Sequence, residues 1–251
     1  MACVENGCAR GQRADAAAPE QSNIMPDRRT AGEATPQRLL DLLLAIAGLV
    51  VLSPFMLLVV LLILIETGRP IFYSQTRIGR DGGRFRIHKF RKFYKDIGAG
   101  SPLTVDHDPR MTPVGRFLAL SKLDELPQLW NVVVGEMAIV GPRPESVDFS
   151  DCFSGSYSKV LEYTPGIFGP SQVAFRDERS FYPKNVDPIQ FYRDVLFPVK
   201  ASIDLAYFPN RTLFWDLLWM VRGVFAVIGG SPPLGSLSPS GRLEQPPTDR
   251  T

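Results

Sequence analysis

Two adjacent carboxylates, Asp124 and Glu125, are the residues of this sequence whose types and spacing could carry out chemistry. They lie in residues 121–129, where Ser121 precedes Asp124 by three positions, a spacing typical of a capping box at the start of a helix. The pair could simply complement the positive end of the helix dipole. It could also act on a phosphate group, and the neighbouring residues favour that second interpretation.

A rigid arginine and a basic segment accompany the acidic pair. Arg143 lies between Pro142 and Pro144, whose rings fix the backbone φ angle and so hold the guanidinium on a stiff turn. The basic segment covers residues 77–95 and contains Arg77, Arg80, Arg84, Arg86, Lys89, Arg91, Lys92 and Lys95. Together these features predict metal-assisted chemistry on phosphate.

Composition sets wide limits on the kind of protein. With 251 residues, 45% of them hydrophobic and 22% charged, the chain can bury a sizeable core in one or two domains. A net charge of +2 is too small to identify a partner. Cys3, Cys8 and Cys152 form no plausible disulfide framework, and their odd number without a secretory signal favours a reducing cytoplasm.

A charge-free segment at residues 42–65 predicts membrane insertion, because a helix of that length extends about 36 Å. Ser53 and Pro54 lie near its middle, where the missing proline donor predicts a kink or break. The basic segment that follows places this side in the cytoplasm. Whether the helix spans the bilayer or returns to the same leaflet stays open at this point.

Four regions follow from these patterns. Residues 1–36 and 229–251 are predicted to be disordered tails, the second rich in proline and serine, and residues 37–66 are the membrane helix. Residues 67–228 form the cytoplasmic domain, in which 110–120 and 121–134 are helical or mixed and 163–170 is a loop. Trp215 and Trp219 in a helix at 213–228 suit either a membrane interface or a core.

Several short motifs in a fixed order resemble those of a known family. They are Arg38-Leu39-Leu40-Asp41, the apolar helix interrupted at Ser53-Pro54, Gly68-Arg69-Pro70-Ile71-Phe72, Gln75-Thr76-Arg77-Ile78-Gly79, His88-Lys89-Phe90-Arg91, Leu123-Asp124-Glu125-Leu126-Pro127-Gln128, Gly141-Pro142-Arg143-Pro144-Glu145, Pro165-Gly166-Ile167 and Asp204-Leu205-Ala206-Tyr207. In this order they resemble the bacterial sugar transferase family, the monotopic phosphoglycosyl transferases. The similarity extends over residues 38–228.

The resemblance implies an enzyme that moves a sugar 1-phosphate from a UDP-sugar to polyprenyl (undecaprenyl) phosphate and releases UMP, the initial step of exopolysaccharide or other glycan biosynthesis. Asp124 would be the nucleophile that forms a phosphosugar ester, and Glu125 would assist the acceptor or help Asp124 bind Mg²⁺. Arg143, Lys89 and Arg91 would face the phosphates, although Lys89 and Arg91 could equally attract anionic lipid headgroups. Downstream glycosyltransferases would use the product.

The resemblance also implies the fold and the location. The fold class is mainly α, with a re-entrant helix-break-helix at Ser53 and Pro54 and a small helical catalytic domain with interfacial helices. The protein would be monotopic, at the cytoplasmic face of the bacterial inner membrane and in contact with its lipids.

Two departures from the family pattern bear on specificity. Ala119 and Leu120 stand where the family usually carries arginine, and Pro170, Ser171 and Phe175 alter the segment after Gly169. If residues 119–122 are helical, Lys122 lies on the same face as Ala119 and could supply the missing charge to the phosphate site. The alternative is that Lys122 is solvated.

Two other classes of protein remain to be distinguished from an enzyme. A non-catalytic membrane-surface binding or scaffold protein would use the basic segment and the tryptophan helix to bind anionic lipid. A nucleic-acid binder would use the same segment, but few aromatic residues are interleaved with its charges, so no nucleic-acid partner is expected.

Overall fold

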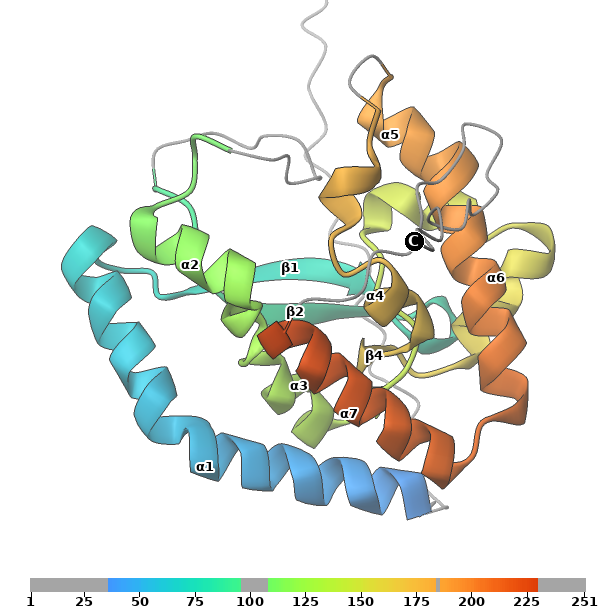
Figure 1. The fold of residues 1–251 in the computed structure, drawn as a ribbon, viewed down its shortest axis with the longest axis horizontal. Coiled ribbons are helices and arrows are strands. Elements are labelled where there is room, and N and C mark those ends of the chain that lie inside the picture. The colour runs from blue at the N-terminus through green and yellow to red at the C-terminus, as the bar shows by residue number, and fades with distance from the viewer. Residues whose placement is uncertain (1–35, 96–107, 184–185, 230–251) are drawn as a thin grey trace, which may run out of the picture.

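The computed structural model describes residues 36–95, 108–183 and 186–229, and the fold is mainly helical (Figure 1). The predictions for the tails therefore fall almost entirely outside the described residues. The helices are α1 (Pro36–Thr67), α2 (Pro113–Ser121), α3 (Gln128–Val134), α4 (Pro170–Ala174), α5 (Pro188–Phe191), α6 (Phe197–Tyr207) and α7 (Leu213–Gly229). The strands are β1 (Phe72–Ile78), β2 (Arg84–Phe90), β3 (Ala138–Val140) and β4 (Gly166–Phe168).

Helix α1 is one continuous helix that bends around the rest of the molecule (Figure 1). Pro54 lies inside it and has no N–H for the carbonyl of Val50, four residues earlier. The Ser53 hydroxyl donates a hydrogen bond of 2.7 Å to that carbonyl, so the oxygen is satisfied without a helical partner. The predicted interruption at Ser53 and Pro54 is thus a bend, not a gap between two helices.

Polar residues near the start of α1 attach it to the domain. Arg38 donates to the carbonyls of Val132 (2.8 Å) and Val133 (3.2 Å) at the C-terminus of α3, where helix carbonyls lack partners. The Asp41 carboxylate accepts a 3.1 Å bond from the Ile139 N–H in β3. Among the described residues, α1 is the one helix long and apolar enough to cross a membrane, judged by length and composition.

The basic segment folds mainly as an antiparallel hairpin of β1 and β2, with Phe72 opposite Phe90 and Ile78 opposite Arg84. The turn between the strands uses left-handed backbone at Asp81 (φ 55°) and Gly82 (φ 75°). On β2, Phe85 and Ile87 are buried in the core. Lys89 continues the same alternation, so it lies on the inward face of the strand.

A second, parallel pair is formed by β3 and β4, which corrects the prediction of a plain loop at 163–170. The backbones of Gly141 and Gly166 approach so closely that a Cβ on Gly166 would lie 2.0 Å from the Gly141 nitrogen. Glycine is required there for close contact between chains. This contact fixes the start of the loop that carries Arg143.

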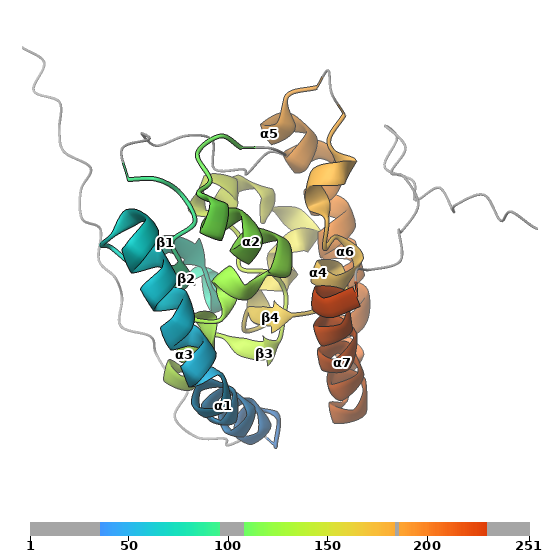
Figure 2. The ribbon, with the colours of Figure 1, turned by 60° about the vertical axis from the view of Figure 1, so that its left-hand side comes forward.

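The core consists of three apolar clusters, and α1 and α7 lie on opposite sides of the hairpin, α2 and α3 (Figure 2). The central cluster joins Ala45 of α1 to Phe85, Val132 and Ile139. A second cluster lies under α6, and a third packs the far half of α1 against Phe90 and α2. Helix α1 therefore contributes side chains to the core of the domain.

Replacing Gly166 by alanine is expected to destabilise the protein by about 3 kcal/mol or more, because the new Cβ collides with backbone that cannot move away. Thermal unfolding of the detergent-solubilised protein measures the loss. Gly48→Ala is the matched control, since its Cβ meets the end of the Leu129 side chain at 3.2 Å. Equal melting temperatures for the two variants would contradict the close contact.

Candidate active site

The acidic pair lies in a short connection between α2 and α3. Helix α2 ends at Ser121, Lys122 adopts left-handed backbone (φ 58°, ψ 13°), and Asp124 and Glu125 occupy the 3₁₀ turn Leu123–Glu125. The predicted capping box is wrong. Ser121 instead donates to the carbonyls of Phe117 (2.8 Å) and Leu118 (3.3 Å) in the last turn of α2.

Asp124 is buried and loosely paired. Its side chain is 3% exposed, and one carboxylate oxygen lies 3.5 Å from the Lys92 Nζ. No described residue donates a hydrogen bond to this carboxylate. Its oxygens are therefore not committed to the hydrogen bonds that usually hold a buried carboxylate. An ionised carboxylate in such surroundings is available as a nucleophile.

Glu125 is held by a tight ion pair. Lys89 Nζ donates to Glu125 Oε1 at 2.6 Å, and both side chains are largely buried. Burial opposes ionisation of Glu125, but Lys89, Arg143 and Lys122 together lower its pKa. Burial lowers the pKa of Lys89 to about 8, although Glu125 and Asp124 favour its charged form. Both members are charged near neutral pH.

Arg143 projects from the loop after β3, and that loop is fixed by backbone bonds. Gly166 N–H donates to the Pro142 carbonyl at 2.8 Å, and Arg77 donates to the Pro144 carbonyl at 3.3 Å. No described residue accepts a hydrogen bond from the Arg143 guanidinium. Burial disfavours its charge, but Glu125 and other nearby carboxylates raise its pKa. The guanidinium is thus charged, positioned and free to bind an anion.

The structure places Arg91 elsewhere, which corrects its assignment to the phosphate site. Its guanidinium donates to the Thr67 hydroxyl and, at 2.7 Å, to the Gly68 carbonyl, where α1 ends. Arg91 is 8% exposed and binds one hydroxyl and one carbonyl at this end, so it anchors α1. Its neighbour Lys92 faces Asp124 instead. Sequence reasoning did not select Lys92, because Arg91 and Lys92 follow the end of β2, where strand alternation no longer says which side chain faces the acidic pair.

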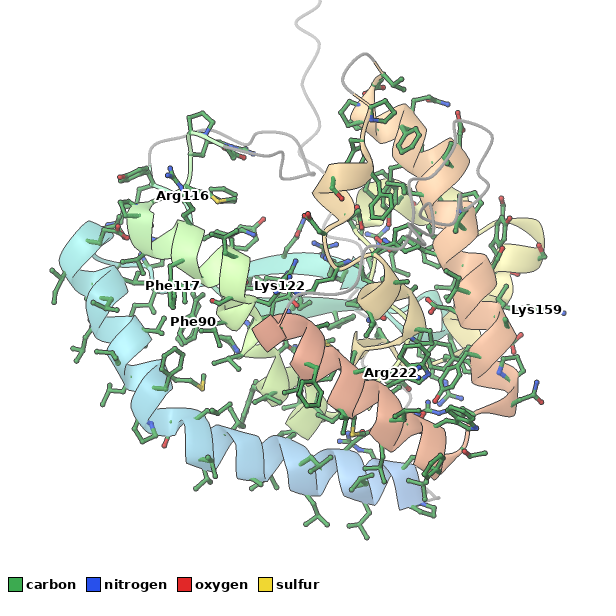
Figure 3. The ribbon with its side chains drawn as sticks, viewed as in Figure 1. Phe90, Arg116, Phe117, Lys122, Lys159 and Arg222 are labelled. Carbon is green, nitrogen blue, oxygen red and sulfur yellow. The ribbon has the colours of Figure 1, made fainter. Side chains whose placement is uncertain are left out.

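Lys122 lies near the acidic pair, but not for the helical reason proposed above. Its left-handed backbone ends α2, so it does not share a face with Ala119, which is buried. Burial lowers the pKa of Lys122, while Glu125 acts in the opposite direction. Figure 3 shows the side chain at the end of α2. The geometry permits a phosphate contact, which stays a prediction.

The carboxylates Asp124 and Glu125 are suited to Mg²⁺ only together with a substrate. Mg²⁺ is usually held by one or two carboxylates, substrate phosphates and water. The described residues contain no group of three or more His, Cys, Asp or Glu that could hold a metal on its own. The oxygens of Asp124, which accept no hydrogen bond from a described residue, are available to a metal ion held jointly with substrate phosphates.

Comparison with known proteins identifies the class of this site. The family model described as "Bacterial sugar transferase" matches residues 32–230. This chain belongs to the bacterial sugar transferase family. The resemblance inferred from the motifs, and with it the prediction of a transferase, is confirmed.

Curated relatives within the bacterial sugar transferase family agree with this membership. The exopolysaccharide production protein ExoY of Sinorhizobium fredii is 33% identical over 207 residues, covering 76% of this chain and 84% of the relative. The UDP-N-acetylgalactosamine-undecaprenyl-phosphate N-acetylgalactosaminephosphotransferase of Aeromonas hydrophila is 31% identical, covering 77% of this chain and 44% of the relative. A putative undecaprenyl-phosphate N-acetylgalactosaminyl 1-phosphate transferase of Bacillus subtilis is 36% identical over half of this chain and 70% of its own length.

Replacing the neighbours Lys92 and Arg91 one at a time tests which residue supports catalysis and which anchors α1. Lys92→Met is expected to lower kcat about 100-fold, because Asp124 loses the ammonium that orients it. Arg91→Met is expected to lower the free energy of unfolding by about 2 kcal/mol, because two hydrogen bonds at the end of α1 are lost. Initial rates and thermal unfolding measure the two effects.

The two variants serve as controls for each other. Lys92→Met should lose kcat even in the fraction that is folded, and folded Arg91→Met should keep its kcat. A fall in kcat that is equal in both variants would contradict the different placement of these two residues.

Proposed function

We propose that this chain transfers a sugar 1-phosphate from a UDP-sugar to a polyprenyl phosphate, such as undecaprenyl phosphate, and releases UMP as the initial step of glycan assembly. The observation that carries the proposal is the buried carboxylate of Asp124, free of hydrogen bonds from described residues and surrounded by cations. The names of the Aeromonas and Bacillus relatives support a sugar phosphate donor and an undecaprenyl phosphate acceptor.

The charge of the site favours a diphosphate as its ligand. Its cations outnumber its carboxylates: Arg77, Lys89, Lys92, Lys122, Arg143 and Lys200 against Asp124, Glu125, Glu145 and Glu178. Buried excess charge is unfavourable unless a ligand compensates it. The diphosphate of a nucleotide sugar supplies the missing negative charge, and the planar guanidinium of Arg143 can bind it through two hydrogen bonds.

The reaction follows from the position of Asp124. A carboxylate oxygen of Asp124 attacks the β-phosphorus of the donor, and the bond from this phosphorus to the bridging oxygen breaks, so that UMP leaves with the electron pair. A phosphate oxygen of the lipid then attacks the same phosphorus and displaces Asp124 as a free carboxylate. Lys92 orients Asp124, Lys89 holds Glu125, and Arg143 stabilises charge on the diphosphate. Mg²⁺, held by Asp124, Glu125 and the phosphates, would supply further charge neutralisation.

We also propose that α1 is re-entrant and that the protein is monotopic, at the cytoplasmic face of the bacterial inner membrane. Both ends of α1 bind the same domain: Arg38 contacts α3, while Glu66 accepts a 3.0 Å bond from the Val114 N–H of α2. A straight helix of this length would separate its ends by about 48 Å. A helix whose two ends meet one compact domain is not expected to cross the bilayer.

Exposed apolar residues on three helices extend the lipid-facing surface of α1. They include Val50, Val51, Leu57 and Ile65 on α1, Phe117 and Leu120 on α2, and Phe214, Trp215 and Phe225 on α7. Exposed large apolar residues in such numbers mark an interaction surface. They support contact with membrane lipids and the predicted interfacial helices.

Asp124→Asn is expected to abolish turnover while the protein remains membrane-bound, because the amide is a poor nucleophile of the same size. UMP release from a UDP-sugar panel with polyprenyl phosphate measures turnover, and membrane flotation measures association. Incubation of the wild type with donor alone should add the mass of a sugar phosphate to the intact chain. Asp124→Asn should show no such addition.

Two results would count against this mechanism. More than a few percent of wild-type activity in Asp124→Asn would exclude Asp124 as the nucleophile. A wild type that releases no UMP with any donor would instead favour the non-catalytic membrane-surface protein.

The topology predicts the accessibility of single cysteines placed at Pro36 and Arg84, in a chain whose natural cysteines are replaced by serine. Both positions are exposed: Pro36 is the first residue of α1, and Arg84 lies beyond its C-terminal end. An impermeant thiol reagent should label both from the cytoplasmic side and neither from the periplasm. Adding Pro54→Leu should move part of the population to a spanning form, because the bend loses its cause. Periplasmic labelling at position 36 without Pro54→Leu would refute the re-entrant helix.

The pKa of Lys89, about 8, predicts an alkaline limit to activity. Above that pH Lys89 becomes neutral and Glu125 loses its partner, so kcat/KM should fall by up to about tenfold per pH unit. Lys89→Arg keeps its charge at these pH values and should remove this decline. The measurement is kcat/KM from about pH 7 to about pH 10. An unchanged alkaline decline in Lys89→Arg would assign it to another group.

A further inference from the structure

An ionic cluster of Lys200, Glu145, Glu178 and Tyr192 lies next to Arg143, and no step of the proposed reaction uses these residues. Lys200, from α6, donates to Glu145 Oε1 at 3.2 Å, to Glu178 Oε2 at 3.1 Å and to the Tyr192 hydroxyl at 2.9 Å. The side chains of Lys200 and Glu145 are 4% and 8% exposed. Burying the charges of Lys200 and Glu145 is costly, and apolar residues could connect α6 to the core at lower cost. The cluster therefore calls for a role other than stability.

Arg143 and this cluster line one small cavity. The cavity has a volume of about 10 Å³, and Arg143, Glu145 and Lys200 contribute to its wall. Glu145 and Glu178 both raise the pKa of Arg143, so their charges act on its guanidinium. Yet neither carboxylate accepts a hydrogen bond from Arg143, and both accept one from Lys200.

We propose that Lys200 is a positioning residue that binds Glu145 and Glu178 and so keeps the Arg143 guanidinium free for the diphosphate of the donor. Without the Lys200 charge, Arg143 would be the neighbouring cation of two carboxylates: that of Glu145, which is buried, and that of Glu178, which is partly exposed and also accepts a 2.9 Å bond from the Tyr182 hydroxyl. Charge-assisted hydrogen bonds between them and Arg143 would then form, because an unpaired buried carboxylate is unfavourable. A diphosphate would have to displace those bonds before it could bind.

The role of Lys200 rests on the proposed function, because it assumes that Arg143 binds the donor diphosphate. A purely structural role predicts something different. If Lys200 only ties α6 to the loop after β3, its loss should lower stability and weaken ligand binding in the same way whether or not Arg143 is present. Coupling between Lys200 and Arg143 in ligand binding therefore distinguishes the two roles.

The test is a double-mutant cycle on the full chain in lipid nanodiscs, with UDP binding measured by isothermal titration calorimetry. Lys200→Met should weaken UDP binding about tenfold, within the range found when a supporting partner of a binding group is lost. In an Arg143→Gln background, Lys200→Met should change the affinity by less than about twofold. Lys200→Met with Glu178→Gln should regain most of the affinity, because the excess carboxylate charge is gone.

Arg193→Met is the matched control. Arg193 lies seven positions before Lys200 in the chain, pairs with Asp151 at 3.5 Å and is more exposed. Its loss should leave UDP affinity unchanged.

The outcomes separate this inference from the proposed function. Wild-type affinity in Lys200→Met, or an equal loss in both Arg143 backgrounds, overturns the positioning role. If Lys200→Met does not fold, the charge-compensated double variant decides, and weak UDP binding by that folded variant overturns the role. A wild type that binds UDP but releases no UMP refutes the transfer reaction alone, while one that binds no UDP overturns both.

Discussion

The pairing of buried charges around Asp124 and Glu125 is the interaction on which the other elements depend. Removing an ionised group from water costs several kcal/mol unless opposite charges or hydrogen bonds compensate. Here the compensation comes from separate parts of the chain: Lys89 and Lys92 from the hairpin side, and Arg143 from the loop after β3. Each part brings a charge that would be unfavourable alone. The hairpin, the connection between α2 and α3, and the Arg143 loop are therefore stable in these positions only together.

The segment that supplies these cations also connects α1 to the site. Arg91 holds the end of α1, and the next residue, Lys92, faces Asp124. The Lys92 carbonyl accepts a 3.0 Å bond from the Thr112 N–H at the start of α2. Gly115 packs so closely against it that a Cβ there would lie 2.0 Å from the Lys92 oxygen. The two residues are thus fixed on one rigid segment. A proposed consequence is that the depth of α1 in the bilayer sets the height of Asp124 above the lipid phosphate.

Local patterns in the sequence were enough to predict part of this arrangement. The charge-free segment predicted α1, and the motifs brought Asp124, Glu125, Lys89 and Arg143 into one site. Two local predictions, the capping box at Ser121 and the shared helical face of Ala119 and Lys122, failed because Lys122 ends α2 in left-handed backbone. The other failures depended on contacts between distant segments. The partners of Arg91 and Lys92 lie at the end of α1 and at Asp124, and the parallel contact of Gly141 with Gly166 makes a strand of an expected loop. Lys200 carried no local signal, because its partner Glu145 is 55 positions away in the sequence.

The charges of the site also explain an order of events in the proposed reaction. Lys89 and Lys92 already face carboxylates, whereas Arg143 has no hydrogen-bonded partner among the described residues. The donor diphosphate therefore meets Arg143 first. When Asp124 becomes an ester it loses its negative charge, and UMP carries further negative charge away. The sugar phosphate supplies one negative charge in its place, so once UMP has left, the cations exceed the anionic groups by as much as they did before the donor bound. That electrostatic excess attracts the second anionic substrate, the lipid phosphate, when the intermediate is ready for it. A neutral nucleophile such as water gains nothing from the same field, so the charge of the site favours transfer to lipid over hydrolysis.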